Sequence, residues 1–387
     1  MRILISDVHA GCQATLWHTF NELGHEAAVL SFSRHSHLLP SLGIPETAII
    51  PPTGPLARRI RGRFERDGDL LKQPGSWKPR NGKRQPLFDL VVCAFPPQFY
   101  RRLVISKVGR SVLCVAAHRL DLHLSDPAAR REFYTQVLQD LDRGKFFLCA
   151  MNEYDSKYAE YYLDRQIDVL PGLRLDIVRE AQSLLGISSD RIPTPLIGPV
   201  HSKGTPQLSF QSLQAALKGK VRPHHEPLGI RQLYPQYRYR DLMRHPCLIA
   251  LPNSVFSISL DEMFAMGLPV LVPGNQLLQE SGLMIDVKLW PIYGDRDIVT
   301  RLSGDRPLQG DPNSPSDTIE EEWLELASWN FRGGTFRWNT PMQLSHLLDR
   351  FSDHETKRTL IAHEMQRAAD IRKRWGDFLA GIERQLS

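Results

Sequence analysis

The sequence predicts an α/β protein made of two tandem domains, each with a parallel sheet covered by helices on both faces. Short apolar runs rich in β-branched residues alternate with helix-period segments, a pattern typical of parallel sheets buried on both faces. A proline-rich break at 191–206 is followed by a second round of the same alternation. The length of 387 residues, with 42% apolar and 24% charged residues, also fits two globular domains.

The order of the elements follows from these runs. Six apolar runs predict the strands of the first domain, at 2–7, 26–32, 89–95, 111–118, 145–151 and 167–172. A helix over 13–23 is expected between the first two runs, because Leu16, Phe20 and Leu23 fall on one face, and Gly24 is suited to end it. The second domain repeats the pattern with runs at 196–200, 227–233, 247–252 and 269–273.

The last segment predicts one long helix over about 356–386. Its apolar residues recur at helical spacing, so one stripe should be buried. The stripe contains Ile361, Met365, Ala368, Trp375, Leu379, Ile382 and Leu386. We therefore expect domains at 1–190 and 191–355, with 356–387 packing across both. Ligands of such sheets bind at the carboxyl ends of the strands, so the chemistry is expected in a cleft between the two domains.

Cysteine usage and hydropathy predict a cytoplasmic protein. The five cysteines are odd in number and scattered, with no CxxC pair, which favours buried thiols over disulfides or zinc ligands. They are Cys12, Cys93, Cys114, Cys149 and Cys247. No run is long and apolar enough to cross a bilayer, and the N-terminus has no signal-peptide pattern. We expect no transmembrane segment and no metal site.

Positive charge is concentrated in one part of the chain. The net charge is +5, yet residues 58–110 contain fourteen Lys and Arg against four acids. Such a cluster favours a polyanionic partner. Within it, 58–84 has too many charges, Gly and Pro to form core, and Phe64 and Trp77 are suited to stacking. A solvated loop is the alternative. The candidate DNA contacts are Arg58, Arg59, Arg61, Arg63, Lys83 and Arg84.

The most informative segment is CLIALPNSVFSISLDEMFAMGLPVLVP at 247–273. It predicts a strand, a polar loop, a helix from about Ser259 and a second strand. It resembles the E-(A/L)-M-A-x-G-x-P-V segment of nucleotide-sugar-dependent glycosyltransferases of the GT-B fold, whose two domains are Rossmann-like. A carboxylate at Glu262, in the first helical turn, is suited to accept the hydroxyls of a ribose. Alternatively, Ser259 and Glu262 form a capping box with no ligand role.

The resemblance implies a donor site around this segment. Retaining family members carry a second glutamate eight residues before the one that Glu262 matches. In this chain Ser254 stands at that position. Loop and helix-start residues are candidate sugar or phosphate contacts: Asn253, Ser254, Ser257 and Ser259. The loop after the first strand of the second domain should meet the donor diphosphate, with cations that neutralise the leaving group. Its candidates are His201, Lys203, Gly204 and, after the next strand, Arg231; a solvated loop lysine is the alternative.

The acceptor side should lie at strand ends of the first domain. His118 ends a buried strand, a place where the resembled enzymes often carry a histidine that contacts the sugar or acts on the acceptor hydroxyl. Asp121 could orient its imidazole for general base catalysis. In SDVHAG, Asp7 and His9 should border the same site. A structural histidine and an ordinary tight turn are the alternatives.

The predicted function is glycosyl transfer without an obligatory metal. The donor is a nucleotide diphosphate sugar, most readily a UDP-sugar, and no cofactor is bound permanently. The acceptor is expected to be a polyanion, either DNA with a hydroxymethylated pyrimidine or an anionic envelope glycan or lipid. One alternative is a non-catalytic nucleic-acid-binding protein on a degenerate scaffold of this fold, and another is an epimerase or related sugar-nucleotide enzyme.

Overall fold

The structure is a computed structural model of the chain. It describes residues 1–61, 86–122, 124, 127–185, 191–198, 210–219, 221, 226–252, 254–281, 310, 312, 317–351 and 355–386. Among these residues the chain divides into two compact units. The first contains Met1–Leu173 and 370–386, and the second contains 174–281 and 317–369.

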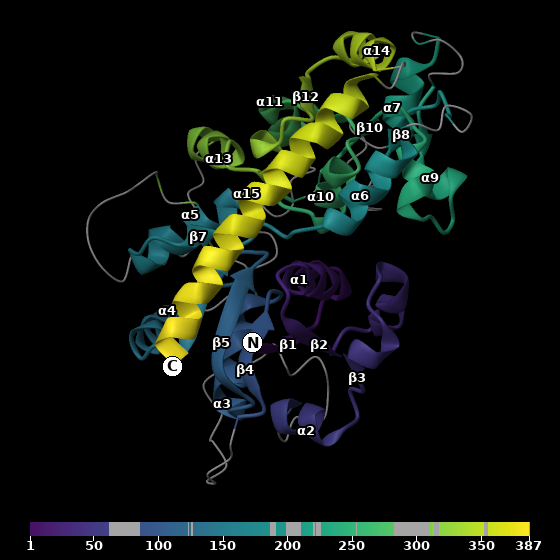
Figure 1. The fold of residues 1–387 in the computed structure, drawn as a ribbon. Helices are drawn as coiled ribbons and strands as arrows, with labels where there is room; N and C mark the ends of the chain where they lie inside the picture. Colours follow the sequence, from purple (N-terminus) through teal and green to yellow (C-terminus); the bar gives the residue numbers. More distant parts are fainter. Residues whose placement is uncertain are drawn as a thin grey trace. The chain divides into compact units, whose positions relative to one another are not determined.

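The first unit is built on a parallel sheet of seven strands with the order β3-β2-β1-β4-β5-β6-β7 among the described residues. Figure 1 shows β5, β4, β1, β2 and β3 side by side in this order. The strands are β1 (Arg2–Asp7), β2 (Glu26–Ser31), β3 (Ile49–Ile50), β4 (Phe88–Cys93), β5 (Gly109–Ala116), β6 (Phe146–Ala150) and β7 (Asp168–Val169). The order reverses direction between β1 and β4, the switch point of a doubly wound sheet.

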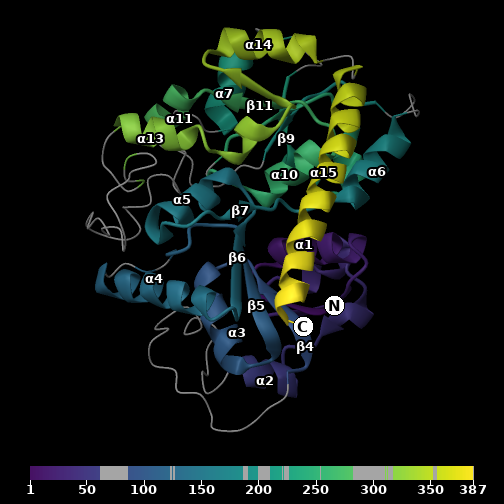
Figure 2. The same cartoon turned by 60° about the vertical axis from the view of Figure 1, so that its left-hand side comes forward.

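Helices cover both faces of this sheet. They are α1 (Ala10–Glu22), α2 (Pro55–Arg61), α3 (Tyr100–Ser106), α4 (Pro127–Asp142) and α5 (Glu153–Leu163), and short 3-10 turns join several elements. Figures 1 and 2 show α4 on the opposite side of the strands from α1. α1 ends as predicted, because Gly24 adopts a left-handed φ of 79° just after the helix.

The second unit repeats the plan on a smaller parallel sheet, β12-β11-β10-β8-β9. The strands are β8 (Leu196–Ile197), β9 (Leu228–Gly229), β10 (Leu248–Ile249), β11 (Val270–Pro273) and β12 (Thr335–Trp338). The helices are α6 (Leu175–Leu184), α7 (Phe210–Leu217), α8 (Ile230–Leu233), α9 (Tyr239–Met243), α10 (Ile258–Ala265), α11 (Asn275–Ser281), α13 (Asp317–Leu324) and α14 (Pro341–Arg350). The switch point lies between β8 and β10. Two doubly wound parallel sheets in one chain confirm the predicted fold class.

The long helix α15 (Glu355–Leu386) contributes to both units. Its first part belongs to the second unit, where Lys357 donates to the carbonyl oxygen of Met243 at 2.6 Å. Its last part belongs to the first unit, where the Trp375 indole donates to the carbonyl oxygen of Pro171 at 2.9 Å. Of the predicted apolar stripe, Ile361, Ala368, Trp375, Leu379 and Ile382 are buried, whereas Met365 and Leu386 are only half-buried.

The unit boundary differs from the predicted one. The first unit ends at Leu173 and not at residue 190, because α6 contacts α9 and α10 of the second unit. All five cysteines are buried and free, as predicted. Among the described residues, no helix is long and apolar enough to cross a membrane. In the same residues, no three His, Cys, Asp or Glu side chains come together as a potential metal site.

Candidate functional site

The helix that carries Glu262 starts earlier than the sequence suggested. α10 begins at Ile258 with Ser257 as its N-cap, and Asp261 is the acidic residue of its first turn. Glu262 therefore lies just beyond the first turn, and Ser259 lies inside the helix. The capping-box alternative is wrong, since Ser259 is not the N-cap. The carboxylate of Glu262 thus needs another explanation.

Arg174 and Tyr239 provide that explanation. The Arg174 guanidinium donates from Nη1 to Oε1 of Glu262 at 2.6 Å. The Tyr239 hydroxyl donates to the same oxygen at 2.8 Å, and Arg174 Nη2 donates to the Tyr239 hydroxyl at 3.4 Å. Among the described residues Oε2 of Glu262 accepts no hydrogen bond. One oxygen of this carboxylate is therefore held by protein donors and the other is open.

Asp176 fixes the guanidinium that holds Glu262. Arg174 donates from Nε to Oδ1 of Asp176 at 2.9 Å and from Nη2 to Oδ2 at 2.8 Å, the two-pronged pairing that best matches a guanidinium to a carboxylate. The side chains of Arg174 and Glu262 are only 4% and 12% exposed. Two carboxylates sharing one buried cation form a charge-assisted network with a defined geometry.

Electrostatics in this cluster follow from burial. Desolvation raises the pKa of the Glu262 carboxyl, while Arg174 and the hydrogen bond from Tyr239 act in the opposite direction. Burial opposes the charge of Arg174, but its carboxylate partners hold the pKa of the guanidinium above its usual value. Burial, followed by the Glu262 charge, raises the pKa of Tyr239. Tyr239 is therefore a neutral hydrogen-bond donor at physiological pH.

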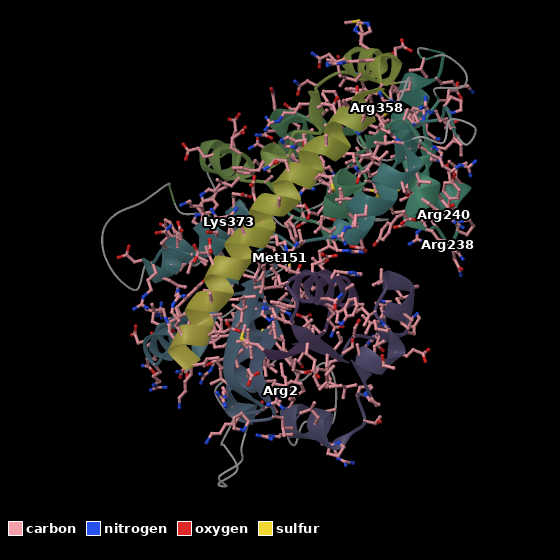
Figure 3. All side chains as sticks on the ribbon, viewed as in Figure 1. Arg2, Met151, Arg238, Arg240, Arg358 and Lys373 are labelled. Carbon is pink, nitrogen blue, oxygen red and sulfur yellow. The ribbon has the colours of Figure 1, made fainter. Side chains whose placement is uncertain are left out.

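An arginine-rich and tyrosine-rich segment lies next to this network. The Arg231 guanidinium stands 4.9 Å from the ring centre of Tyr237 and donates to the carbonyl oxygen of Pro235 at 2.9 Å. The charge of Glu262 is among the causes that raise the pKa of Tyr237, after burial, so Tyr237 is near that carboxylate. Arg238 and Arg240 are exposed on and beside α9 (Figure 3). Arg231, a predicted donor contact, thus lies beside Tyr237 in this segment.

The remaining predicted donor contacts have mixed outcomes. Ser254 is buried, and its hydroxyl accepts from the Phe256 amide at 3.5 Å, so it supports its own turn. Ser257 makes no capping bond with its side chain, and Ser259 is half-buried. The other predicted contacts lie outside the described residues: His201, Lys203, Gly204 and Asn253.

A second group of predicted residues meets at the carboxyl edge of the first sheet, at its switch point. Phe95, just after β4, lies between two imidazoles. Its ring centre is 5.6 Å from that of His9 and 5.9 Å from that of His118. His9 is exposed and His118 is half-buried. The sequence placed both histidines at strand ends, and the fold brings them to one edge.

Hydrogen bonds determine which nitrogen of each neutral ring carries the proton. Nδ1 of His9 accepts from the Cys12 amide at 3.2 Å, which makes His9 the N-cap of α1. Nδ1 of His118 accepts from the Arg119 amide at 2.8 Å. A backbone N–H can only donate, so each neutral ring carries its proton on Nε2. Desolvation, followed by the charge of His35, lowers the pKa of His9 and favours this neutral form.

Asp7 is buried and bonded to backbone amides and is not exposed at the sheet edge as expected. Asp7 has no exposed surface. Its Oδ2 accepts from the amides of Ala94 and Phe95 at 2.5 and 2.8 Å, and its Oδ1 accepts from the His9 amide at 2.8 Å. Burial raises its pKa to about 7 against these bonds. Asp7 is thus an anchor that ties β1, β4 and α1 together.

Asp121 is directed to other partners. It is buried, accepts from the Tyr158 hydroxyl at 3.1 Å and lies 3.8 Å from Nε of Arg130. Among the described residues it makes no hydrogen bond to His118. The expectation that Asp121 orients the imidazole of His118 therefore has no support in this geometry, because the Arg119 amide holds that ring instead.

The predicted basic arm is described only at its start. Arg59 donates to the carbonyl oxygens of Ser106 and Lys107 at 3.0 and 2.5 Å, so it caps the end of α3. Arg58 is exposed, and Arg61 is the last residue of α2. Arg63, Lys83 and Arg84 lie outside the described residues. Of the six predicted DNA contacts, Arg59 has a structural role.

Comparisons with known proteins give little further information. No protein-family model and no curated protein matches the chain. Among solved structures, CalG4, described as the calicheamicin glycosyltransferase, matches over 98% of each chain with 11% identity and a TM-score of 0.42. A match at that level carries no conclusion about the activity of this chain.

Proposed function

We propose that the chain is a glycosyltransferase that moves a sugar from a nucleoside diphosphate to a hydroxyl of an anionic acceptor. The observation that carries the proposal is the state of Glu262. A carboxylate only 12% exposed, with one oxygen saturated by Arg174 and Tyr239, is held in a single orientation, and its second oxygen remains an acceptor. Paired hydroxyls of a ribose are suitable donors for such an oxygen.

The surroundings of Glu262 fit the rest of a nucleotide. Tyr237 offers an aromatic ring, and Arg231 beside it offers a cation. Arg238 and Arg240 are further exposed cations on the same segment. When the nucleoside diphosphate leaves the sugar, negative charge builds on its phosphate oxygens. Such cations can neutralise this charge without a metal ion. The loop candidates His201, Lys203, Gly204 and Asn253 remain proposed contacts, and a UDP-sugar remains the proposed donor.

The two imidazoles of the first unit are proposed to bind the acceptor. With its proton on Nε2, His9 presents a hydrogen-bond donor suited to an acceptor oxygen or an anionic group, and His118 lies at the same edge of the sheet. For His118 to act as a general base, its ring would first have to exchange tautomers. The proposed acceptor is a polyanion, either hydroxymethylated-pyrimidine DNA or an anionic envelope glycan or lipid.

Calorimetry with UDP, GDP and ADP tests the donor half of the proposal. At least one should bind the wild type, and Glu262→Gln should weaken that binding by about tenfold or more, because a hydrogen bond to a charged group is lost. Glu322→Gln, which makes the same charge change at an exposed position of α13, should bind like wild type. Equal binding by all three proteins would refute the assignment.

The acceptor half has its own test. Glycosyl transfer requires release of the nucleotide from its sugar, which a non-catalytic nucleic-acid-binding protein would not produce. Mobility shifts of duplex DNA over a salt series distinguish the two acceptor classes, since phosphate contacts weaken steeply as salt rises. Absence of a shift at low salt would eliminate DNA and leave the envelope glycan or lipid.

A further inference from the structure

A nucleotide site alone does not explain why Arg174 is buried beside Glu262. Arg174 is the N-cap residue of α6, and its side chain is 96% removed from solvent. All of its hydrogen bonds to described side chains go to Asp176, Glu262 and Tyr239. A buried arginine is costly unless every part of it is paired. A site that only needed a carboxylate would not need this cation.

We propose that Arg174 is a positioning residue for nucleotide binding. By occupying Oε1, it turns Oε2 of Glu262 toward the ligand, so that the site selects nucleotides with an intact ribose 2′,3′-diol. This inference rests on the proposed function and adds to it the residue that orients the Glu262 carboxylate.

The donor count supports this selectivity. A carboxylate oxygen has two acceptor directions. Nη1 of Arg174 and the hydroxyl of Tyr239 take both directions of Oε1, at 2.6 and 2.8 Å. Both directions of Oε2 therefore remain for two ligand donors. A ribose diol supplies two, whereas a 2′-deoxyribose supplies one and leaves an acceptor direction unsatisfied on a side chain that is only 12% exposed.

The charges that face Glu262 make Arg174 decisive. α6 contributes Arg174 and, farther away, Asp176, and the segment before and at the start of α9 contributes Tyr237 and Tyr239. The neighbouring Asp261 is already paired with Arg332 at 2.7 Å. Among the described residues, Arg174 is the cation that contacts the Glu262 carboxylate. Its removal leaves burial and a second carboxylate, both of which favour the protonated form of Glu262.

The test compares the pH dependence of nucleotide affinity in wild type, Arg174→Gln and Arg174→Lys. Whichever of UDP, GDP and ADP binds most tightly serves as the probe, titrated from pH 5 to pH 8. Wild-type affinity should fall at acid pH as Glu262 takes up a proton. In Arg174→Gln this fall should move up by a pH unit or more, and affinity at pH 7 should drop by about tenfold or more. Arg174→Lys keeps the positive charge but not the two-pronged guanidinium, so the midpoint of its pH profile should lie between those of wild type and Arg174→Gln.

Two further arms keep the result interpretable. The 2′-deoxy form of the probe should bind wild type about tenfold more weakly than the ribose form. Tyr239→Phe keeps the aromatic ring and the charge of Arg174 but removes one hydrogen bond to Glu262, so it should raise the midpoint pH by less than Arg174→Gln does. If circular dichroism shows that the arginine variants fail to fold, Tyr239→Phe replaces them in the test.

The outcomes separate this inference from the proposed function. If wild type binds a probe and Arg174→Gln or Tyr239→Phe binds it with the wild-type affinity and pH profile, the positioning role is wrong and the nucleotide site stands. Equal binding of ribose and 2′-deoxyribose forms overturns the diol selectivity. If wild type binds none of the three probes, the proposed function fails, and this inference fails with it.

Discussion

His245 should make the second unit sensitive to acid. The residue is completely buried at the end of α9. Its Nδ1 lies 2.7 Å from the carbonyl oxygen of Thr194, and its Nε2 lies 2.8 Å from the Tyr234 hydroxyl. A neutral ring with its proton on Nδ1 satisfies both contacts, donating to Thr194 and accepting from Tyr234. Burial, only partly offset by the Thr194 bond, lowers its pKa to about 4.

The magnitude follows from linkage. Above pH 6.5 His245 is neutral in the folded and the unfolded state, so it costs nothing. Between pH 6.5 and pH 4 the unfolded chain binds a proton that the folded chain does not, so stability falls as the pH falls. With pKa values of 6.5 unfolded and about 4 folded, the loss between pH 7.5 and pH 4.5 is about 2.5 kcal/mol.

The matched variant is His245→Asn, whose amide can still donate to Thr194 but does not titrate. Guanidinium unfolding at pH 7.5 and pH 4.5 should be followed by tryptophan fluorescence, with the transitions of the two units fitted separately. Both proteins lose stability in acid through their carboxylates, but the variant should lose about 2.5 kcal/mol less than wild type. The same acid loss in both proteins would show that His245 does not cause the acid sensitivity.

Two other predictions concern the same unit. Burial lowers the pKa of Lys357 to about 7. The residue should therefore make the free energy of unfolding rise by roughly 1.4 kcal/mol per pH unit between pH 7 and pH 10. Lys357→Met should remove this rise from unfolding curves, and an unchanged slope would contradict the prediction. Gly267 has a φ of 69°, and an added Cβ would lie 2.3 Å from Cγ1 of Ile361. Gly267→Ala should therefore destabilise by roughly 3 kcal/mol from backbone strain and overpacking together. Gly219→Ala, with a φ of 70° and no atom of the described residues within 4 Å of the added Cβ, should cost about 1 to 2 kcal/mol. Equal costs at the two glycines would show that the contact with Ile361 is relieved.

The central strands were predictable, as were the edge strands β7 and β9, whereas the edge strands β3 and β12 were not. β1, β4, β5 and β6 are buried on both faces, so each appears in the sequence as a nearly continuous apolar run. β3 has only Ile49 and Ile50, both half-buried, and β12 reads TFRW with an exposed Arg337. Both strands lie at sheet edges, where one side needs no partner and polar residues are tolerated. Their sequences therefore carried no strand signal.

The candidate site was predictable only where its residues are local. Glu262 was found because the helix and strand around it form a recognisable segment. Its partners Arg174 and Tyr239 lie 88 and 23 residues away along the chain. No local pattern links them, although the Arg-x-Asp spacing of Arg174 and Asp176 after a strand could have drawn attention. Similarly, the proline-rich break at 191 suggested a domain boundary, but packing of α6 moves it to residue 173.

A crystal structure with a bound nucleoside diphosphate would show whether Glu262 binds the ribose. We expect both ribose hydroxyls within hydrogen-bonding distance of Oε2 of Glu262, with Arg174 and Tyr239 still on Oε1. A nucleotide bound elsewhere, or a Glu262 whose two oxygens are both taken by protein donors in the complex, would contradict this expectation.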